Sequence, residues 1–230
     1  MPIRQAGGGP IEVLMVRRNP ELSFGGMWTF PGGGIEPGDG AVPSPLDEDT
    51  QDWGAPSLLA TAASASAREA FEETALEVTT SALTWFSHWI PPKAGVPKRF
   101  ATWFFLAPEH RGDVVVDRSE NDEARWISAH SALQQNAEGS FPLAVPTWIT
   151  LDDLAQSTDI ASLIDTTATQ GATWYHTHAL RQIDATEPGP SALCWPGDAA
   201  YETGDLESPG PRNRVVIGPK FSVAERVRTS

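Results

Sequence analysis

The sequence predicts a protein of the α/β or α+β class, in which β-strands and flanking helices pack as a sandwich. Three observations carry this prediction: an apolar strand at residues 11–16, a long alanine-rich helix at residues 57–76, and several short strands after that helix. Hydrophobic residues make up 40% of the 230-residue chain, so it can bury a core and does not belong to the disordered class. The strand order does not follow from the sequence.

The first half of the chain combines regular elements with glycine-rich turns. The predicted strand Ile11–Val16 is followed by a polar turn at residues 17–20 and a glycine-rich stretch at residues 25–39. Residues 40–56 are rich in Pro, Asp and Gly and lack periodicity, which predicts an exposed loop. Ser57 is expected to be the N-cap of the long helix, because Ser is a favoured N-cap residue and neither Pro nor Gly interrupts the following turns.

The second half predicts shorter elements. Further strands are expected at Trp85–Ile90, Phe100–Ala107, Asp113–Val116, Arg125–Ile127 and Arg214–Ile217. Further helices are expected at Ser128–Gln135 (closed near Gly139), Pro146–Gln156 and Asp159–Thr167. We therefore expect a first domain at residues 1–148, and a mostly helical C-terminal extension at residues 149–230 that packs on it.

The acidic composition limits the classes of partner. The net charge of −14 argues against nucleic acid, because binding a phosphate backbone requires a basic face. An acidic protein can still bind a polyphosphate through a divalent cation. The single cysteine, Cys194, excludes an intramolecular disulfide and is expected to be a buried apolar residue. With neither a membrane-length apolar run nor a signal peptide, we expect a cytoplasmic protein without a membrane partner.

Three carboxylates share one side of the long predicted helix. Glu69 precedes Glu72 by three residues and Glu73 by four, which are the spacings of neighbours on a helix surface. At these spacings like charges destabilise a helix by roughly 0.2–0.5 kcal/mol per pair. A bound divalent cation makes the same cluster favourable, because Mg²⁺ prefers oxygen ligands. Taken alone, the pattern has a solvated acidic face as its ordinary alternative. The upstream turn Phe30–Asp39 favours a metal or anion site, because its glycines let the backbone approach closely.

Together, the turn and the helix resemble the Nudix box, Gly-x5-Glu-x7-Arg-Glu-U-x-Glu-Glu-x-Gly-U, where U is a bulky aliphatic residue. Gly33 matches the first glycine, and Asp39 stands where the first glutamate belongs. The second half is matched in register by Arg68, Glu69, Glu72, Glu73 and Leu76. Ala70 fills an aliphatic position, and Ala75 replaces the glycine that ends the helix. The resemblance implies an α+β fold, an α/β/α Nudix-like sandwich whose mixed sheet is flanked by helices.

The long spacing between the two halves of the box resembles that of one branch of the family. Residues 40–67 separate them, where the family has a much shorter spacer. This insertion is similar to that of a coenzyme A diphosphatase-like branch, whose mammalian peroxisomal member also carries a long insertion in its box. Gly26–Gly33 resembles the end of a coenzyme A-associated motif, although Leu22 occupies the position of that motif's arginine. Further stretches similar to that branch are Trp89–Pro92, Pro97–Phe105 and Pro196–Asp198.

The resemblance implies metal-binding and catalytic roles on the helix. Glu72 and Glu73 are expected to hold Mg²⁺ or Mn²⁺ together with the backbone of Gly33, and Glu69 is expected to be a ligand or the general base. Arg68 is expected to orient the carboxylates through charge-assisted hydrogen bonds.

Residues outside the helix are also assigned roles. An assisting acid is expected at Glu123 or Glu120, with a solvated acidic turn as the alternative. Lys98 and Arg99 are expected to contact a substrate phosphate, and Trp28 to stack on adenine. An exposed loop charge and a core position are their respective alternatives. His176 and His178 lack further ligands at metal-site spacing and are not expected to bind a metal.

The implied function is hydrolysis of a diphosphate linkage in a small-molecule substrate, coenzyme A or acyl-coenzyme A. Two alternatives remain: a diphosphatase for ADP-ribose or a dinucleotide, and a Nudix-fold binding module without catalysis. The complete set of box carboxylates disfavours the binding module, which does not need all of them. The sequence leaves the oligomeric state open, a homodimer included.

Overall fold

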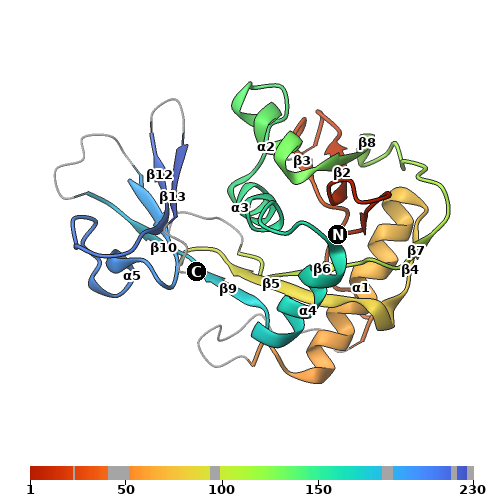
Figure 1. The fold of residues 1–230 in the computed structure, drawn as a ribbon, viewed down its shortest axis with the longest axis horizontal. Helices are drawn as coiled ribbons and strands as arrows, with labels where there is room; N and C mark the ends of the chain where they lie inside the picture. Colours follow the sequence, from red (N-terminus) through yellow and green to blue (C-terminus); the bar gives the residue numbers. More distant parts are fainter. Residues whose placement is uncertain (23, 41–51, 94–98, 183–188, 219–221, 227–230) are drawn as a thin grey trace. The chain divides into compact units, whose positions relative to one another are not determined.

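The computed structural model describes residues 1–22, 24–40, 52–93, 99–182, 189–218 and 222–226. The chain forms two compact units (Figure 1). The first combines Met1–Phe86 with Phe104–Gly171, and the second combines Ser87–Trp103 with Ala172–Ser230. The expected domain boundary at residue 148 stays a prediction, because a compact unit is not shown to fold alone.

The first unit mixes strands and helices. Its strands are β1 (Ile3–Arg4), β2 (Glu12–Arg18), β3 (Trp28–Thr29), β4 (Glu77–Val78), β7 (His110–Arg111) and β8 (Asn121–Ser128). Its helices are α1 (Pro56–Thr74), the 3-10 helix η1 (Thr80–Ala82), α2 (Ala129–Ala137), α3 (Val145–Leu154) and α4 (Ile160–Gln170). The chain passes between the units within β5 (Thr84–Ile90) and β6 (Thr102–Leu106). This mixture confirms the predicted α+β class.

Strand β2 is the centre of the main sheet of the first unit. It pairs with β1, β3 and β8, each time antiparallel. Parallel bridges of Pro2 with Ala107 and of Trp28 with Leu143 add a parallel component, so the sheet is mixed as predicted. Val13–Val16 are all buried, because β2 has neighbours on both sides and packing on both faces. The predicted strand at residues 11–16 is therefore confirmed, and it continues to Arg18.

One hydrophobic core holds the first unit together. Side chains from β1 and β2 meet residues of β8, α2, α3 and α4 there. Trp28 stacks on Phe141 with ring centroids 4.4 Å apart and an interplanar angle of 10°. Leu151, Leu154 and Leu163 join the same core, so helices α3 and α4 belong to this unit. These helices and α2 confirm the three short helices that the sequence predicts.

Two expectations for the first unit are wrong in detail. Helix α1 begins at Pro56 and not after Ser57; its N-cap is Ala55, because proline at the first helical position already has the required φ and lacks only an N–H that needs no partner there. Residues 113–116 do not form a strand. The N–H of Val115 donates instead to the carbonyl of Thr74, at the end of α1, so this segment completes a helix terminus and not a sheet.

The second unit is built mainly from strands. They are β9 (Thr173–His176), β10 (His178–Leu180), β11 (Ala192–Cys194), β12 (Asn213–Ile217) and β13 (Ser222–Arg226), with one short helix, α5 (Ala199–Thr203). Strands β10 to β13 form an antiparallel sheet in chain order, and β9 pairs parallel with β5. The expectation that residues 149–230 are mostly helical is therefore wrong beyond Gly171. The described segments there are mainly short strands linked by turns. Each strand has too few residues to show a clear hydrophobic period in the sequence.

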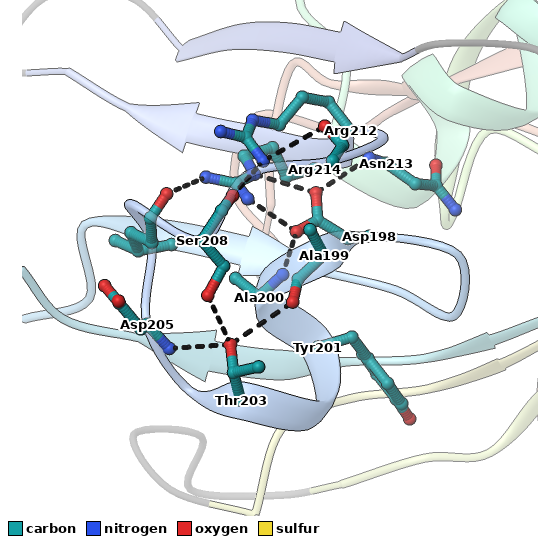
Figure 2. Close-up of polar contacts among 12 residues, drawn as sticks. Asp198, Ala199, Ala200, Tyr201, Thr203, Asp205, Ser208, Arg212, Asn213 and Arg214 are labelled. Atoms are coloured by element: carbon teal, nitrogen blue, oxygen red, sulfur yellow. Dashed lines mark hydrogen bonds and ion pairs between the residues drawn. The ribbon is translucent and has the colours of Figure 1, made fainter.

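A buried ion pair connects α5 to β12. Asp198 is the N-cap of α5, and its side chain accepts hydrogen bonds from the N–H groups of Ala200 and Asn213. The guanidinium of Arg214 donates to both oxygens of the same carboxylate (Figure 2). These donors keep the pKa of Asp198 below its ordinary value although burial opposes this. The pair thus has the hydrogen bonds that a buried charge requires.

Aromatic side chains fill the interior of the second unit. Trp89 stacks on Tyr175 with ring centroids 4.2 Å apart, and Trp195 packs edge-on against both rings. The indole N–H of Trp195 donates to the hydroxyl of Thr177. Cys194 is fully buried, and burial raises the pKa of its thiol to about 11, so it is the apolar core residue that the sequence predicts.

Helix α1 ends in a strained conformation that one substitution should relieve. Ala75 is the C-cap with φ 57° and ψ 12°, in the left-handed region that glycine adopts without cost. We expect Ala75→Gly to raise the free energy of unfolding by about 0.5–1 kcal/mol, measured by urea denaturation, since strain relief exceeds the entropy lost by glycine. Ala60→Gly, on an exposed site within the same helix, should lower it by a similar amount. Equal signs for both variants would contradict this account.

Candidate active site

The glycine-rich turn and helix α1 meet closely although many residues separate them in the sequence. A Cβ atom added to Gly33 would lie 2.5 Å from the carboxyl group of Glu69, so only glycine fits there without displacing that side chain. Asp39 receives two hydrogen bonds from Arg68, both 3.0 Å long. The two halves of the resemblance therefore form one site, in the register that the sequence predicts.

Part of the long segment between the glycine-rich turn and Arg68 belongs to helix α1. Residues 56–67 add about three turns before Arg68, at 3.6 residues per turn. Gly40 lies against this added part, because a Cβ atom there would meet the Thr61 hydroxyl at 2.4 Å. Residues 41–51 of the predicted loop lie outside the described residues.

Arg68 connects the turn and the carboxylates of the helix. Besides Asp39, its guanidinium donates to Glu69 at 2.8 Å, to Glu72 at 2.9 Å and to the carbonyl of Gly34 at 2.8 Å. These hydrogen bonds lower the pKa of Asp39 and raise that of Arg68, so both stay charged. The rigid fork of the guanidinium suits such simultaneous contacts. Arg68 thus has the geometry to orient carboxylates.

Glu73 is the most buried carboxylate of the site. Its side chain receives hydrogen bonds from the Gly32 N–H at 2.9 Å and from the Asn121 amide at 3.1 Å. Both donors favour the ionised form, but burial outweighs them, and with the charges of Glu69 and Glu120 it raises the pKa of Glu73 from 4.5 to about 7. An acidic group held in this way is typical of functional sites.

The charges of Glu69, Glu73 and Glu120 act on one another. Burial raises the pKa of Glu69 above its ordinary value, Arg68 opposes the rise, and the charges of Glu72 and Glu120 add to it. Three mutually repelling carboxylates are the hard oxygen donors that Mg²⁺ and Mn²⁺ prefer. Among the described residues, no three Asp, Glu, His or Cys side chains lie together in an arrangement that could hold a metal ion. The donor set therefore fits a divalent cation in chemistry and charge, and the side chains of Glu72 and Glu120 are exposed.

The two predicted assisting acids lie in different surroundings. The carboxylate of Glu123 pairs with Arg125 at 2.7 Å and with Arg17 at 3.3 Å. Glu120 contributes to the raised pKa values of Glu69 and Glu73, and its carbonyl anchors the loop after β2 through the N–H of Asn19. The geometry therefore favours Glu120 over Glu123.

Of the three predicted substrate-binding residues, Trp28 belongs to the same unit as the carboxylates. Trp28 is 2% exposed in the core, with Phe141 stacked on it and the Arg125 guanidinium 5.0 Å from its ring, so no face is open for adenine. Arg99 belongs to the second unit and donates to the carbonyl of Pro91. Lys98 lies outside the described residues.

Two contributors were not predicted from the sequence. The backbone N–H of Gly32 and the side chain of Asn121 hold Glu73, and neither carries a chemical signal of its own. Asn121 lies four residues before the predicted strand Arg125–Ile127, and an uncharged amide there is ordinary in a turn.

Comparison with solved structures shows the fold. The chain is similar to a Nudix hydrolase from Alicyclobacillus acidocaldarius, with a TM-score of 0.55 and 24% identity over 71% of this chain and 92% of that one. A MutT Nudix hydrolase from Burkholderia pseudomallei gives a TM-score of 0.42, with 19% identity over 66% and 97% of the two chains. The NUDIX domain of Shewanella oneidensis NrtR, solved with ADP ribose, gives 0.46, with 19% identity over 67% and 81%.

Neither a family model nor a curated protein matches the sequence. The likeness to the Alicyclobacillus structure nevertheless shows that this chain has the Nudix fold.

The raised pKa of Glu73 predicts how stability depends on pH. Between its ordinary value of 4.5 and about 7, the folded protein binds this proton more tightly than the unfolded chain, so stability falls as pH rises through that window. Without divalent cations, the free energy of unfolding of Glu73→Gln relative to wild type should rise from pH 5 to pH 8, on the order of 1–3 kcal/mol. Urea denaturation at several pH values measures this difference. Exposed Glu77→Gln is the control, and a pH-independent difference for Glu73→Gln would refute the assignment.

Proposed function

We propose that this protein hydrolyses a diphosphate linkage in a nucleoside diphosphate derivative and uses Mg²⁺ or Mn²⁺. One observation carries the proposal: on a Nudix fold, the turn at Gly33 and Asp39 closes on the helix that bears Arg68, Glu69 and Glu73. The site combines oxygen donors, a buried carboxylate and a guanidinium that orients its neighbours.

Individual residues have distinct tasks in this proposal. Glu69, Glu72 and Glu73 hold the cation together with the backbone of Gly33, and Glu69 is also placed to act as general base. A divalent cation at this position neutralises the diphosphate and lowers the pKa of a bound water molecule. Glu120 is the assisting acid, because its charge acts on the carboxylates of Glu69 and Glu73. Arg68 keeps Asp39, Glu69 and Glu72 in a fixed arrangement.

The burial of Glu73 favours an enzyme over a module that only binds a nucleotide. A buried carboxylate with a raised pKa lowers the stability of the folded protein at neutral pH. A module that only binds a nucleotide does not require such a group, whereas catalytic sites commonly contain one. The net charge of −14 is consistent with a small-molecule substrate bound through a cation and not with nucleic acid. Among the described residues, no helix has the length and apolarity for crossing a membrane.

Coenzyme A or acyl-coenzyme A is the substrate class that we propose, with ADP-ribose or a dinucleotide as the alternative. The support is the sequence resemblance of Gly26–Gly33, and the long separation of the box halves, to the coenzyme A diphosphatase-like branch. Coenzyme A differs from the alternatives by its 3'-phosphate. The basic pair Lys98 and Arg99 is proposed to contact this group.

Hydrolysis by the helix carboxylates is tested with amide variants. Glu73→Gln should lower the turnover of a diphosphate substrate by about 10²–10³-fold, since the amide keeps the shape of the side chain and loses its charge. Chromatographic separation of the adenosine 3',5'-bisphosphate formed from coenzyme A and the AMP formed from ADP-ribose, with and without Mg²⁺, measures the effect. Turnover within a few-fold of wild type would show that this helix is not the site.

Glycine variants sharpen this test. Gly33→Ala should also lose turnover, because its Cβ displaces the Glu69 carboxylate. Gly38→Ala lies in the same turn with open space around its Cβ position and should retain wild-type turnover.

Substrate preference is tested by removing one phosphate. Wild type should hydrolyse coenzyme A with a higher kcat/KM than 3'-dephospho-coenzyme A. In a Lys98→Ala, Arg99→Ala double variant the ratio of the two kcat/KM values should fall about tenfold, which is the range expected for the loss of a charge-assisted contact. Lys93→Ala removes a nearby positive charge and should leave the preference unchanged. If wild type instead strongly prefers ADP-ribose, the coenzyme A assignment is wrong while diphosphate hydrolysis stands.

A further inference from the structure

Asn121 is a fully buried polar residue that donates to Glu73, and it has no task in the proposed function. It is the first residue of β8 and has no exposed surface. Its amide nitrogen donates to Oε1 of Glu73 at 3.1 Å, while the Gly32 N–H donates to Oε2 at 2.9 Å. Each carboxylate oxygen of Glu73 therefore receives one neutral donor, and the plane of the carboxylate is fixed from two sides.

The orientation of the Asn121 amide follows from chemistry. As a cation ligand Glu73 is ionised, and an ionised carboxylate accepts hydrogen bonds and donates none, so the NH₂ group of Asn121 faces it. As a consequence, Oδ1 of Asn121 is buried with no hydrogen-bond partner. Buried polar atoms are nearly always satisfied, and an exception next to a charged cluster indicates a site that receives a water molecule or an ion.

The backbone around Asn121 keeps its side chain in place. The N–H of Asn121 donates to the carbonyl of Asp117, and the N–H of Asp117 donates to the carbonyl of Glu73. Asn121 is also paired with Arg18 in the β2–β8 ladder. Side chain and backbone thus tie residues 117–121, which include Glu120, to Glu73 at two points. A support built on a strand end and a helix end is more rigid than one on a free loop.

We propose that Asn121 is a positioning residue that holds Glu73 in the orientation needed to bind the divalent cation. The inference rests on the proposed function only in taking Glu73 as a cation ligand. The amide N–H fixes one oxygen of Glu73, and Oδ1 of Asn121 is buried without a hydrogen-bond partner. Residues that orient metal ligands in this way typically contribute 10–100-fold to metal affinity.

The test measures Mn²⁺ binding directly and does not depend on knowing the substrate. In Asn121→Leu, a change of similar volume without polar atoms, the Mn²⁺ dissociation constant measured by electron paramagnetic resonance should rise about tenfold or more. The melting temperature of the metal-free protein should fall as well, because Oε1 of buried Glu73 loses its donor, so the fold of the variant is checked separately by circular dichroism. In a Glu73→Gln background, Asn121→Leu should cause no further rise, since its effect passes through Glu73.

Two further variants separate positioning from folding. Asn136 also donates its amide to a backbone carbonyl in the first unit, that of Phe141, so Asn136→Leu should lower the melting temperature and leave Mn²⁺ affinity unchanged. If Asn121→Leu does not fold, Asn121→Ser, whose hydroxyl is shorter and leaves space for water, should show the same loss of affinity.

The outcomes distinguish the two proposals. Weaker Mn²⁺ binding in both Glu73→Gln and Asn121→Leu supports the positioning role. Weaker binding in Glu73→Gln alone overturns the role of Asn121 while the proposed cation site stands. Unchanged binding in both variants removes the proposed cation site, and the role of Asn121 with it.

Discussion

The approach of the glycine turn to helix α1 is the constraint on which the site depends. Gly33 faces the carboxyl group of Glu69 at a distance that leaves no space for a Cβ atom, and Arg68 reaches from the helix to Asp39 and to the carbonyl of Gly34. Because one guanidinium binds both segments, the turn and the carboxylates keep a fixed relation. The added turns of α1 do not disturb it, since they extend the helix on the N-terminal side of Arg68.

Opposing effects meet at Glu73. Its two hydrogen-bond donors stabilise the negative charge, while burial and the neighbouring carboxylates destabilise it, and the second group of effects is larger. A folded protein gains nothing in stability from this arrangement at neutral pH. A cation in the same place would relieve the repulsion, so the cost to stability and the capacity to bind a cation have the same physical origin.

The buried ion pair of the second unit shows the contrasting case. Asp198 receives donors from Arg214 and from two backbone N–H groups, and these keep its pKa below the ordinary value despite burial. Hydrogen bonding thus decides the charge state of Asp198, whereas burial decides that of Glu73. A buried carboxylate therefore indicates a functional site only where its hydrogen bonds fail to compensate for its burial.

By itself, the sequence determined the elements with long or distinctive patterns: the buried strand β2, helix α1, helices α2 to α4, and the register that joins Gly33 and Asp39 to Arg68 and Glu69. The elements depend on local periodicity, which is visible in one dimension, and the register follows from the resemblance of the turn and the helix to the Nudix box. Only the tertiary structure decided that Trp28 is a core residue and that Asn121 donates to Glu73. It also decided that the charge of Glu120 acts on the helix carboxylates, and that the described residues beyond Gly171 mainly form strands. The reason is physical: burial, pKa and the partner of an uncharged amide depend on groups that the chain brings together from distant positions, and a short strand takes its identity from the neighbour with which it pairs.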